Sequence, residues 1–221
     1  MDGGCAVVEK MARAGFFYGD LDAAFYTHEH PDHTGGMLPL LFATNYTPGW
    51  ERGRPLPIFG PKGTAALLER AVALYEAVRP KGYEVAMTEL SPPAAGRLGS
   101  LRFRVEAADH AGLPALCYRF EAGGASVAYS GDTQECDGLA SLAAGADLLI
   151  LECSYPSGMG VPGHLDAAAC GRVARGAGAG RLLLVHMYEP CDRVDIAAQV
   201  QEDGGYDGEV IVGEDLAEIP L

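Results

Sequence analysis

The six histidines of this 221-residue chain include a cluster that could bind metal ions. His28, His30 and His33 lie within six residues of one another, and Asp32 lies among them. Imidazole and carboxylate are preferred ligands of Zn²⁺ and related metals. In an extended stretch His28 and His30 point the same way and can share one metal ion. Asp32 and His33 follow the bend at Pro31, so they can turn toward a second ion.

Three further candidate ligands, His110, Asp132 and His186, come shortly after predicted strands. Ligand sites in α/β folds assemble at strand ends, where loops converge on a rigid sheet. Asp132 directly follows a strand, and we expect its carboxylate to bridge two cations. A single histidine is more often a core or surface residue than a ligand, but a four-residue cluster followed by three ordered ligands favours a metal centre.

The rest of the sequence predicts a mixed α/β chain. Apolar patterns predict strands at 23–27, 57–59, 83–90, 101–107, 115–120, 126–130, 148–151, 181–185 and 209–212. Helices are expected at 6–12, 37–46, 64–78, 165–174 and 196–200, with another ending near 144. The proline- and glycine-rich segment 92–96 is interpreted as a turn, so residues 1–221 are expected to form a single domain.

Composition narrows the function classes. The chain is 48% hydrophobic and 21% charged, as is usual for globular proteins, and its net charge of −14 disfavours nucleic-acid partners. The six cysteines show no C-x-x-C spacing, which indicates reduced thiols in a cytosol. No signal peptide is visible, and the longest uncharged run, 34–50, contains prolines at 39 and 48. We therefore expect a soluble, cytoplasmic protein with no membrane partner.

The order of these residues resembles that of the metallo-β-lactamase-fold hydrolases. The match covers nearly the whole chain and consists of His28, His30, Asp32, His33, His110, Asp132 and His186. The resemblance implies an α/β fold, the four-layered αββα sandwich of that family. The C-terminal part is similar to the ribonuclease Z and phosphodiesterase branch, in which a glutamate after an apolar strand and a histidine opening the next helix form an acid dyad. Glu152 and His164 match this dyad, although alone they would fit an ordinary strand-end carboxylate and a helix cap.

The sequence departs from the family pattern in two places. Residues 111–131 leave room for one hairpin only, so the long arm with which ribonuclease Z grips tRNA has no place there. Family members usually begin with a β-hairpin that runs into an Asp-x-Gly turn, and Asp2-Gly3-Gly4 resembles this turn with only Met1 before it. About two strands are expected to be missing by comparison with the family, and the exposed sheet edge predicts a homodimer.

The resemblance implies a dinuclear metal-dependent hydrolase. One ion is assigned to His28, His30 and His110 and the other to Asp32, His33 and His186, with Asp132 bridging. Two divalent ions about 3.5–4 Å apart lower the pKa of a bound water to near 7, which makes hydroxide available at neutral pH. Zn²⁺ is the expected metal, with Mn²⁺ or Fe²⁺ as alternatives.

In this assignment Asp32 orients the nucleophile, and His164, held by Glu152, protonates the leaving group. The expected substrate is a small phosphodiester, and tRNA is disfavoured by the charge and the missing arm. Two alternatives remain open. The first is hydrolysis of a lactone, lactam or thioester by the same fold, and the second is a metal-binding protein without turnover.

Overall fold

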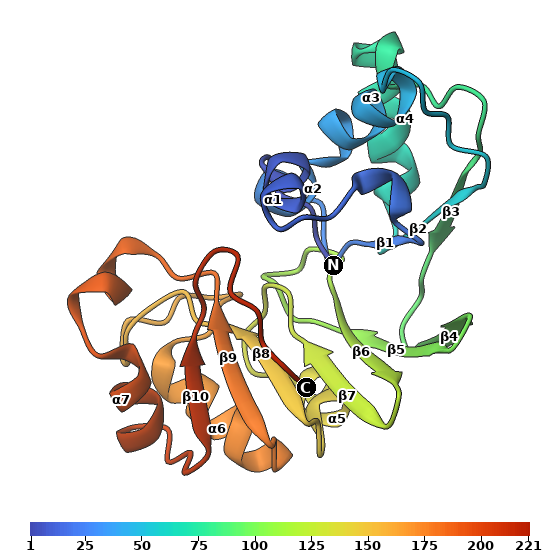
Figure 1. Ribbon diagram of the computed structural model, residues 1–221. Coiled ribbons are helices and arrows are strands. Elements are labelled where there is room, and N and C mark those ends of the chain that lie inside the picture. Colours follow the sequence, from blue (N-terminus) through green and yellow to red (C-terminus); the bar gives the residue numbers. More distant parts are fainter. The chain divides into compact units, whose positions relative to one another are not determined.

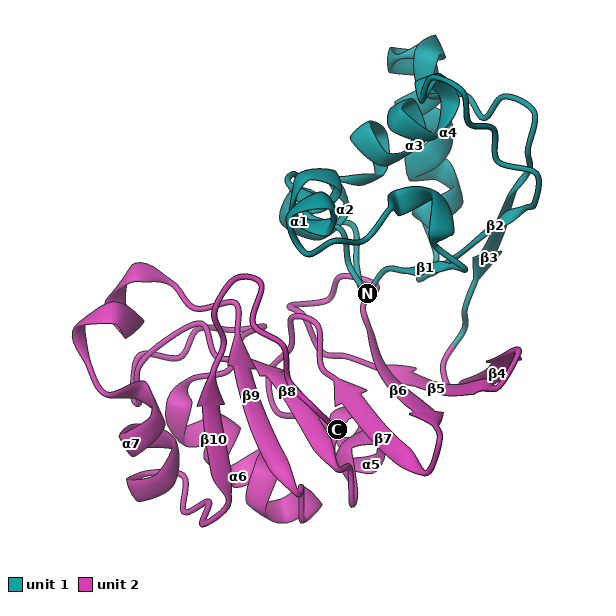
Figure 2. Ribbon diagram, in the orientation of Figure 1, with its two compact units in different colours: residues 1–91 teal, residues 92–221 magenta.

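The structure, a computed structural model, describes all 221 residues and divides into two compact units (Figure 2). The first unit comprises residues 1–91 and the second comprises residues 92–221. The division falls at the segment that was expected to be a turn inside one domain. The single domain over residues 1–221 stays a prediction.

The first unit is built around a three-stranded parallel sheet in the order β1-β2-β3 (Figure 1). Its strands are β1 (Ala24–Phe25), β2 (Leu56–Gly60) and β3 (Val85–Glu89). Its helices are α1 (Val7–Arg13), α2 (Pro31–Thr34), α3 (Met37–Tyr46) and α4 (Thr64–Leu74), with 3₁₀ helices at Tyr18–Asp20 and Glu76–Val78. Parallel strands need crossover connections, and α3 and α4 lie in the crossovers β1–β2 and β2–β3. Loops that leave these strands at their C-terminal ends therefore lie at one edge of this sheet.

The core of the first unit lies between these helices and the sheet. Alternate residues of β2 are buried, as expected for a strand that is covered on one face. They pack with apolar side chains of the helices and loops in one cluster, whose buried members are Tyr26, Met37, Leu41, Leu56, Ile58, Val72 and Val78. This cluster stabilises the segment that carries His28.

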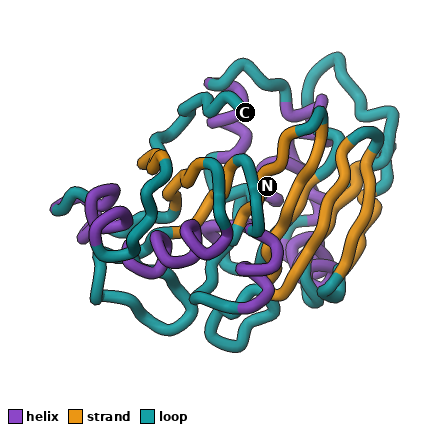
Figure 3. Tube along the Cα trace, turned by 90° about the horizontal axis from the view of Figure 1, so that it is seen from below, coloured by secondary structure: helices purple, strands orange, loops and turns teal.

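The second unit contains a seven-stranded mixed sheet in the order β10-β9-β8-β7-β6-β5-β4, whose strands run side by side in Figure 3. The strands are β4 (Ala94–Leu98), β5 (Leu101–Ala107), β6 (Leu116–Ala122), β7 (Ala125–Tyr129), β8 (Leu148–Glu152), β9 (Arg181–Val185) and β10 (Glu209–Val212). The pairs from β4 to β7 are antiparallel, and those from β7 to β10 are parallel.

Three helices complete the second unit, namely α5 (Asp137–Ala143), α6 (Ala167–Ala177) and α7 (Ile196–Glu202), together with a 3₁₀ helix at Glu189–Arg193. Helix α5 packs against β5, β6 and β7, and α6 contacts β8 and α7. The Asp166 side chain caps α6 by accepting a hydrogen bond from the Ala169 N–H at 2.8 Å, and Gly178 ends the helix in the left-handed conformation. The buried core of this unit is rich in leucine and alanine from the sheet and these helices.

The strand directions distinguish the two edges of this sheet at which the strands begin and end. Strands β5, β7, β8 and β9 run the same way, so their C-terminal ends share one edge. The β4–β5 turn and the β6–β7 turn at Gly123-Gly124 lie at the opposite edge. Residues that follow β5, β7, β8 and β9 can therefore meet, and residues of the two turns lie away from them.

The expected α/β class is confirmed, and every predicted strand has a counterpart. Two expectations were wrong in detail. Residues 94–96 of the segment expected to be a turn belong to strand β4, because Ala94–Leu98 pairs with β5 in full register. Helix α6 begins at Ala167, two residues later than expected, because Asp166 provides the cap. The longest helices have 11 residues, and none of the helices could cross a membrane.

Candidate metal centre

In the first unit the loop after β1 gathers three imidazole rings. The ring centroid of His28 lies 4.0 Å from that of His33 and 4.6 Å from that of His30. Pro31 starts helix α2, and this one-turn helix turns Asp32 and His33 out of the extended stretch, as the spacing predicted. His28 and His33 are almost fully buried, whereas Asp32 is exposed.

The carboxylate of Asp2 fixes the orientation of two of these rings. Asp2 Oδ2 lies 2.8 Å from His33 Nδ1 and accepts a hydrogen bond from the Thr27 hydroxyl at 2.8 Å. Thr27 Oγ1 in turn lies 3.0 Å from His28 Nδ1. Since the hydroxyl proton goes to Asp2, the hydrogen-bond pattern assigns a proton to His28 Nδ1. Asp2 thus orients His33 directly and His28 through Thr27.

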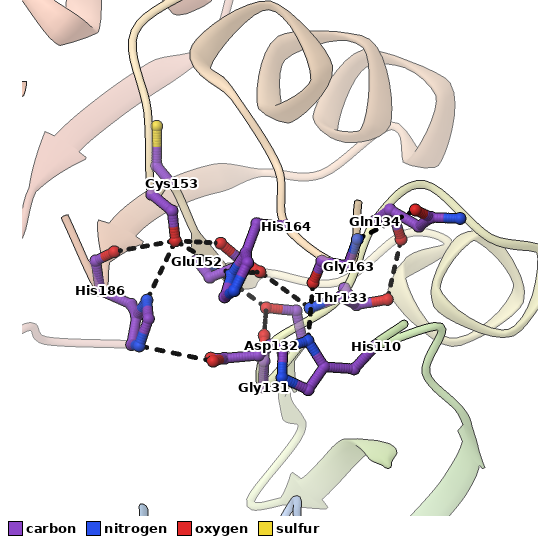
Figure 4. Close-up of polar contacts among 12 residues, drawn as sticks. His110, Gly131, Asp132, Thr133, Gln134, Glu152, Cys153, Gly163, His164 and His186 are labelled. Atoms are coloured by element: carbon purple, nitrogen blue, oxygen red, sulfur yellow. Dashed lines mark hydrogen bonds and ion pairs between the residues drawn. The ribbon is translucent and has the colours of Figure 1, made fainter. Parts of the chain in front are cut away.

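In the second unit the side chains of His110, Asp132 and His186 lie together where the strands of the large sheet end (Figure 4). Asp132 is 2% exposed, and its Oδ2 lies 3.4 Å from Nε2 of His186. His186 has φ of +56°, a left-handed backbone conformation that is uncommon outside glycine. Such backbone strain persists only where the surroundings enforce it and is concentrated at functional sites.

His110 is held by the loop that carries His164. Its Nδ1 lies 2.8 Å from the carbonyl oxygen of Gly163, which accepts the hydrogen bond. Gln134 ties the same loops together, because its Oε1 accepts from the Gly163 N–H at 3.0 Å and its Nε2 donates to Asp109 at 2.6 Å. Gly163 has φ of +86°, and a Cβ there would lie 3.1 Å from His110 Nδ1. A glycine is therefore needed where the chain passes His110.

Glu152 and His164 are close, as the sequence predicted, and Ser154 joins them to His186. His164 Nδ1 lies 3.0 Å from Glu152 Oε1, and the Ser154 hydroxyl donates to Glu152 Oε2 at 2.6 Å. Ser154 Oγ also lies 3.0 Å from His186 Nδ1, so it accepts the proton of that ring. Glu152 itself is buried and accepts a further hydrogen bond from the Thr133 N–H at 2.8 Å. His164 is not a helix cap, since Asp166 performs that role.

Two cysteine thiols contact the backbone of residues 152–154. Cys170 Sγ donates to the Glu152 carbonyl at 3.1 Å, and burial raises the pKa of this thiol well above its usual value. Cys191 Sγ contacts the carbonyls of Cys153 and Ser154 at 3.5 Å, and burial raises its pKa to about 11. These thiols stay neutral at pH 7 and act as small packing groups. All six cysteines are free of disulfides.

One pattern is common to the candidate residues of both units. The Nδ1 atoms of five histidines each have a hydrogen-bond partner: His28, His33, His110, His164 and His186. Metal-binding histidines typically donate their second ring N–H in this way, which fixes the tautomer and leaves Nε2 for the ion. With the carboxylates of Asp32 and Asp132 the donor set is the nitrogen and oxygen set that Zn²⁺ and related ions prefer. The residues present therefore fit divalent cations.

Sequence reasoning missed the residues that hold the ligands, chiefly Asp2, Thr27, Ser154 and Gly163. Asp2 was noted only as part of a turn, and Thr27 only as a strand end. Ser154 gave a weak signal, because it follows Glu152 by two residues and so points the same way at a strand end. Nothing in the sequence around Gly163, apart from its being a glycine, indicated that it contacts His110.

Comparison with known proteins gives consistent matches. A model of the beta-lactamase superfamily domain matches residues 11–187. A ribonuclease Z of Mycobacterium bovis is 35% identical over 164 residues, which cover 68% of this chain and 58% of that protein. The match thus spans less than two thirds of the relative's length.

Two solved structures have the same arrangement of strands and helices. The metallo-beta-lactamase fold protein YhfI from Bacillus subtilis is 26% identical, with a TM-score of 0.79 over 97% of this chain and 83% of that one. The short form of human tRNase Z is 20% identical, with a TM-score of 0.78 over 100% of this chain and 87% of that one. They confirm the metallo-β-lactamase fold that the sequence predicted.

Proposed function

This chain belongs to the beta-lactamase superfamily, and from that premise we propose that it is a metal-dependent hydrolase, a dinuclear phosphodiesterase that acts on a small phosphodiester. The observation that carries the proposal is the anchoring of four assigned ligands, His28, His33, His110 and His186, through Nδ1, which leaves each Nε2 for a metal ion. The fold implies divalent metal ions. Their number and identity, and the reaction, are proposals.

We assign the ligands as the sequence order suggests. One ion takes His28, His30 and His110, the second takes Asp32, His33 and His186, and Asp132 bridges the two. Zn²⁺ is the first choice, because imidazole and carboxylate suit it well, and Mn²⁺ or Fe²⁺ are alternatives. Two such ions would polarise a phosphoryl oxygen and supply hydroxide at neutral pH.

His164 is the proposed general acid. Its Nδ1–H is directed at the buried Glu152 carboxylate at 3.0 Å, so its Nε2 points away from Glu152 and can deliver a proton to a leaving alkoxide. Glu152 positions the ring through this contact. Asp32, exposed beside His33, would orient the attacking nucleophile.

The substrate is proposed to be small and poor in phosphate groups. The formal net charge of −14 repels long polyanions. The segment between His110 and Asp132 is β6, β7 and short connections, so it contains no extended arm. The relatives named ribonuclease Z make RNA the main competing substrate class. The homodimer and the cytoplasmic location stay predictions, and sedimentation of the purified chain tests the first.

A substrate panel tests the proposal. Protein reconstituted with Zn²⁺ or Mn²⁺ is assayed on bis-p-nitrophenyl phosphate, phosphorylcholine esters, lactones, nitrocefin and a precursor tRNA. We expect turnover of the phosphodiesters, with His110→Ala inactive and the exposed Asp22→Asn unchanged. Preferential turnover of lactones or nitrocefin would favour the alternative hydrolase, and efficient, salt-sensitive tRNA cleavage would overturn the small-substrate assignment. Lack of turnover with every substrate would leave only metal binding.

A further inference from the structure

One face of the large sheet carries four arginines in adjoining positions of three strands. Strands β4, β5 and β6 lie side by side (Figure 1). Their register places Arg97 directly opposite Arg102 and Arg104 directly opposite Arg119. Like charges in directly opposed positions destabilise a sheet. The chain has only 16 basic residues and a net charge of −14, so two such pairs on one face are not explained by composition.

A cavity of about 440 Å³ opens among these side chains. Arg97, Arg102 and Arg119 line it together with Ser100 and the backbone of the β6–β7 turn. The lining contains no aromatic ring. Its position at the turn edge of the sheet is opposite to the edge that carries His110, Asp132 and Glu152, so it is separate from the proposed metal centre.

The carboxylates on this face do not balance the arginines. Glu121 lies 2.9 Å from Arg119 Nε and 3.3 Å from Arg102 Nη2, and the hydrogen bond from Arg119 lowers the pKa of Glu121. Asp147 is hydrogen-bonded to the backbone and side chain of Ser126, and Glu106 lies further along β5. Arg97 has its Nε on the carbonyl oxygen of Gly99 at 2.6 Å. The lining of the cavity thus contains three arginines and one carboxylate, Glu121. The Arg119 guanidinium is mostly buried and also donates to the carbonyl oxygens of Leu142 and Ala144 at 3.2 and 2.8 Å, so Arg97 and Arg102 are the exposed donors.

We propose that this cavity binds a small polyanion that carries at least two phosphate groups. Guanidinium groups bind phosphate through paired N–H donors, and a bound polyanion would relieve the repulsion within the Arg97–Arg102 pair, both members of which line the cavity. The volume is within the range of sites for small molecules. Because no aromatic ring is available to stack on a nucleobase, the phosphates themselves are the recognised part. The proposal is independent of the reaction at the other edge.

Binding is tested by thermal unfolding of the full chain with pyrophosphate and tripolyphosphate as probes. We expect both to raise the melting temperature of the wild type in a saturable way. Arg97→Thr removes one charge of an opposed pair without breaking an ion pair. It should unfold at the same or a higher temperature without ligand and bind pyrophosphate at least tenfold more weakly. Arg172→Thr, which alters an ion pair with Glu135 on the outer surface, is the matched control and should respond as the wild type does.

Three results would overturn the proposal. The first is no response of the wild type to either probe. The second is the same rise with sodium chloride at equal ionic strength, because that would show general screening of the arginines. The third is an undiminished response in Arg97→Thr, which would place the polyanion elsewhere, including at bound metal. A second variant, Arg102→Thr on the opposite strand, is tested by isothermal titration with pyrophosphate, and an affinity equal to that of the wild type would likewise count against the proposal.

Discussion

Asp2 Oδ2 lies 2.8 Å from His33 Nδ1, and the same carboxylate reaches His28 through the hydroxyl of Thr27. The second unit repeats this chemistry, since Glu152 reaches His186 through the hydroxyl of Ser154. Each unit therefore orients an imidazole through a carboxylate and a hydroxyl. Such outer partners are important for metal affinity.

Replacing Asp2 should weaken metal binding without removing a ligand. We expect Asp2→Ala to lower metal affinity by about 10–100-fold, because His33 loses its acceptor and the Thr27 hydroxyl that contacts His28 loses the carboxylate that orients it. Competition with a chromophoric chelator measures this affinity. Asp22→Ala, on the exposed ion pair with Arg54, is the control. Equal affinities for both variants would show that Asp2 serves only the fold.

Ser154→Ala should affect both stability and metal affinity. Its hydroxyl contacts Glu152 and His186, and leaving such buried groups without it costs about 1–3 kcal/mol in the free energy of unfolding. His186 also loses the partner that fixes its tautomer, so we expect about 10–100-fold weaker binding of one metal equivalent. Urea unfolding and chelator competition give the two values. The exposed Ser141→Ala should change neither, and a loss of stability alone would refute the orienting role.

Replacing His164 with alanine tests whether this residue is the general acid or a metal ligand. For phosphodiesters with poor leaving groups we expect kcat to fall about 10²–10⁴-fold, which is the usual contribution of general acid catalysis. For activated aryl esters kcat should fall much less, because their leaving groups need no proton. The metal content should stay unchanged. Steady-state kinetics on both substrate types together with elemental analysis check this. Equal losses on both, or loss of metal, would show a structural or ligating histidine.

The stability of the second unit should depend on Asp147 in a pH-dependent way. Hydrogen bonds from the Ser126 side chain and then its backbone hold the pKa of Asp147 below its usual value. A pKa lower in the folded than in the unfolded chain stabilises the fold above the unfolded value of about 3.9, and this contribution is lost as pH falls through the folded value. Asp147→Asn should therefore unfold at lower urea than the wild type at pH 7, with the difference narrowing below about pH 4. A difference independent of pH, or one matched by the exposed Asp207→Asn, would contradict this.

Much of the fold could be predicted because local patterns agree with the tertiary structure. Helix α3 and strands β5, β9 and β10 have the expected bounds, and the single hairpin expected between His110 and Asp132 is formed by β6 and β7. Strand β4 was missed because its Ala-Ala-Gly segment has no residue with a strong strand preference. Its pairing depends on β5, where the Phe103 ring covers Gly96 so closely that a Cβ would lie 2.3 Å from it.

The candidate ligands could be predicted, whereas their supports could not. The spacing of His28, His30 and His33 is local, so the sequence displays it directly. Asp2 and His33 are 31 residues apart, and Ser154 and His186 are 32 apart. Nothing in a single sequence indicates that these pairs meet, because the sheets bring them together.

A metal titration tests the central claim most directly. Protein freed of metal by a chelator is titrated with Zn²⁺ or Mn²⁺ while turnover of bis-p-nitrophenyl phosphate is followed. The account predicts no turnover at the start and a rise to a plateau at two equivalents per chain. A plateau at one equivalent would contradict the dinuclear centre, and no turnover at two or more equivalents of either metal would contradict the phosphodiesterase.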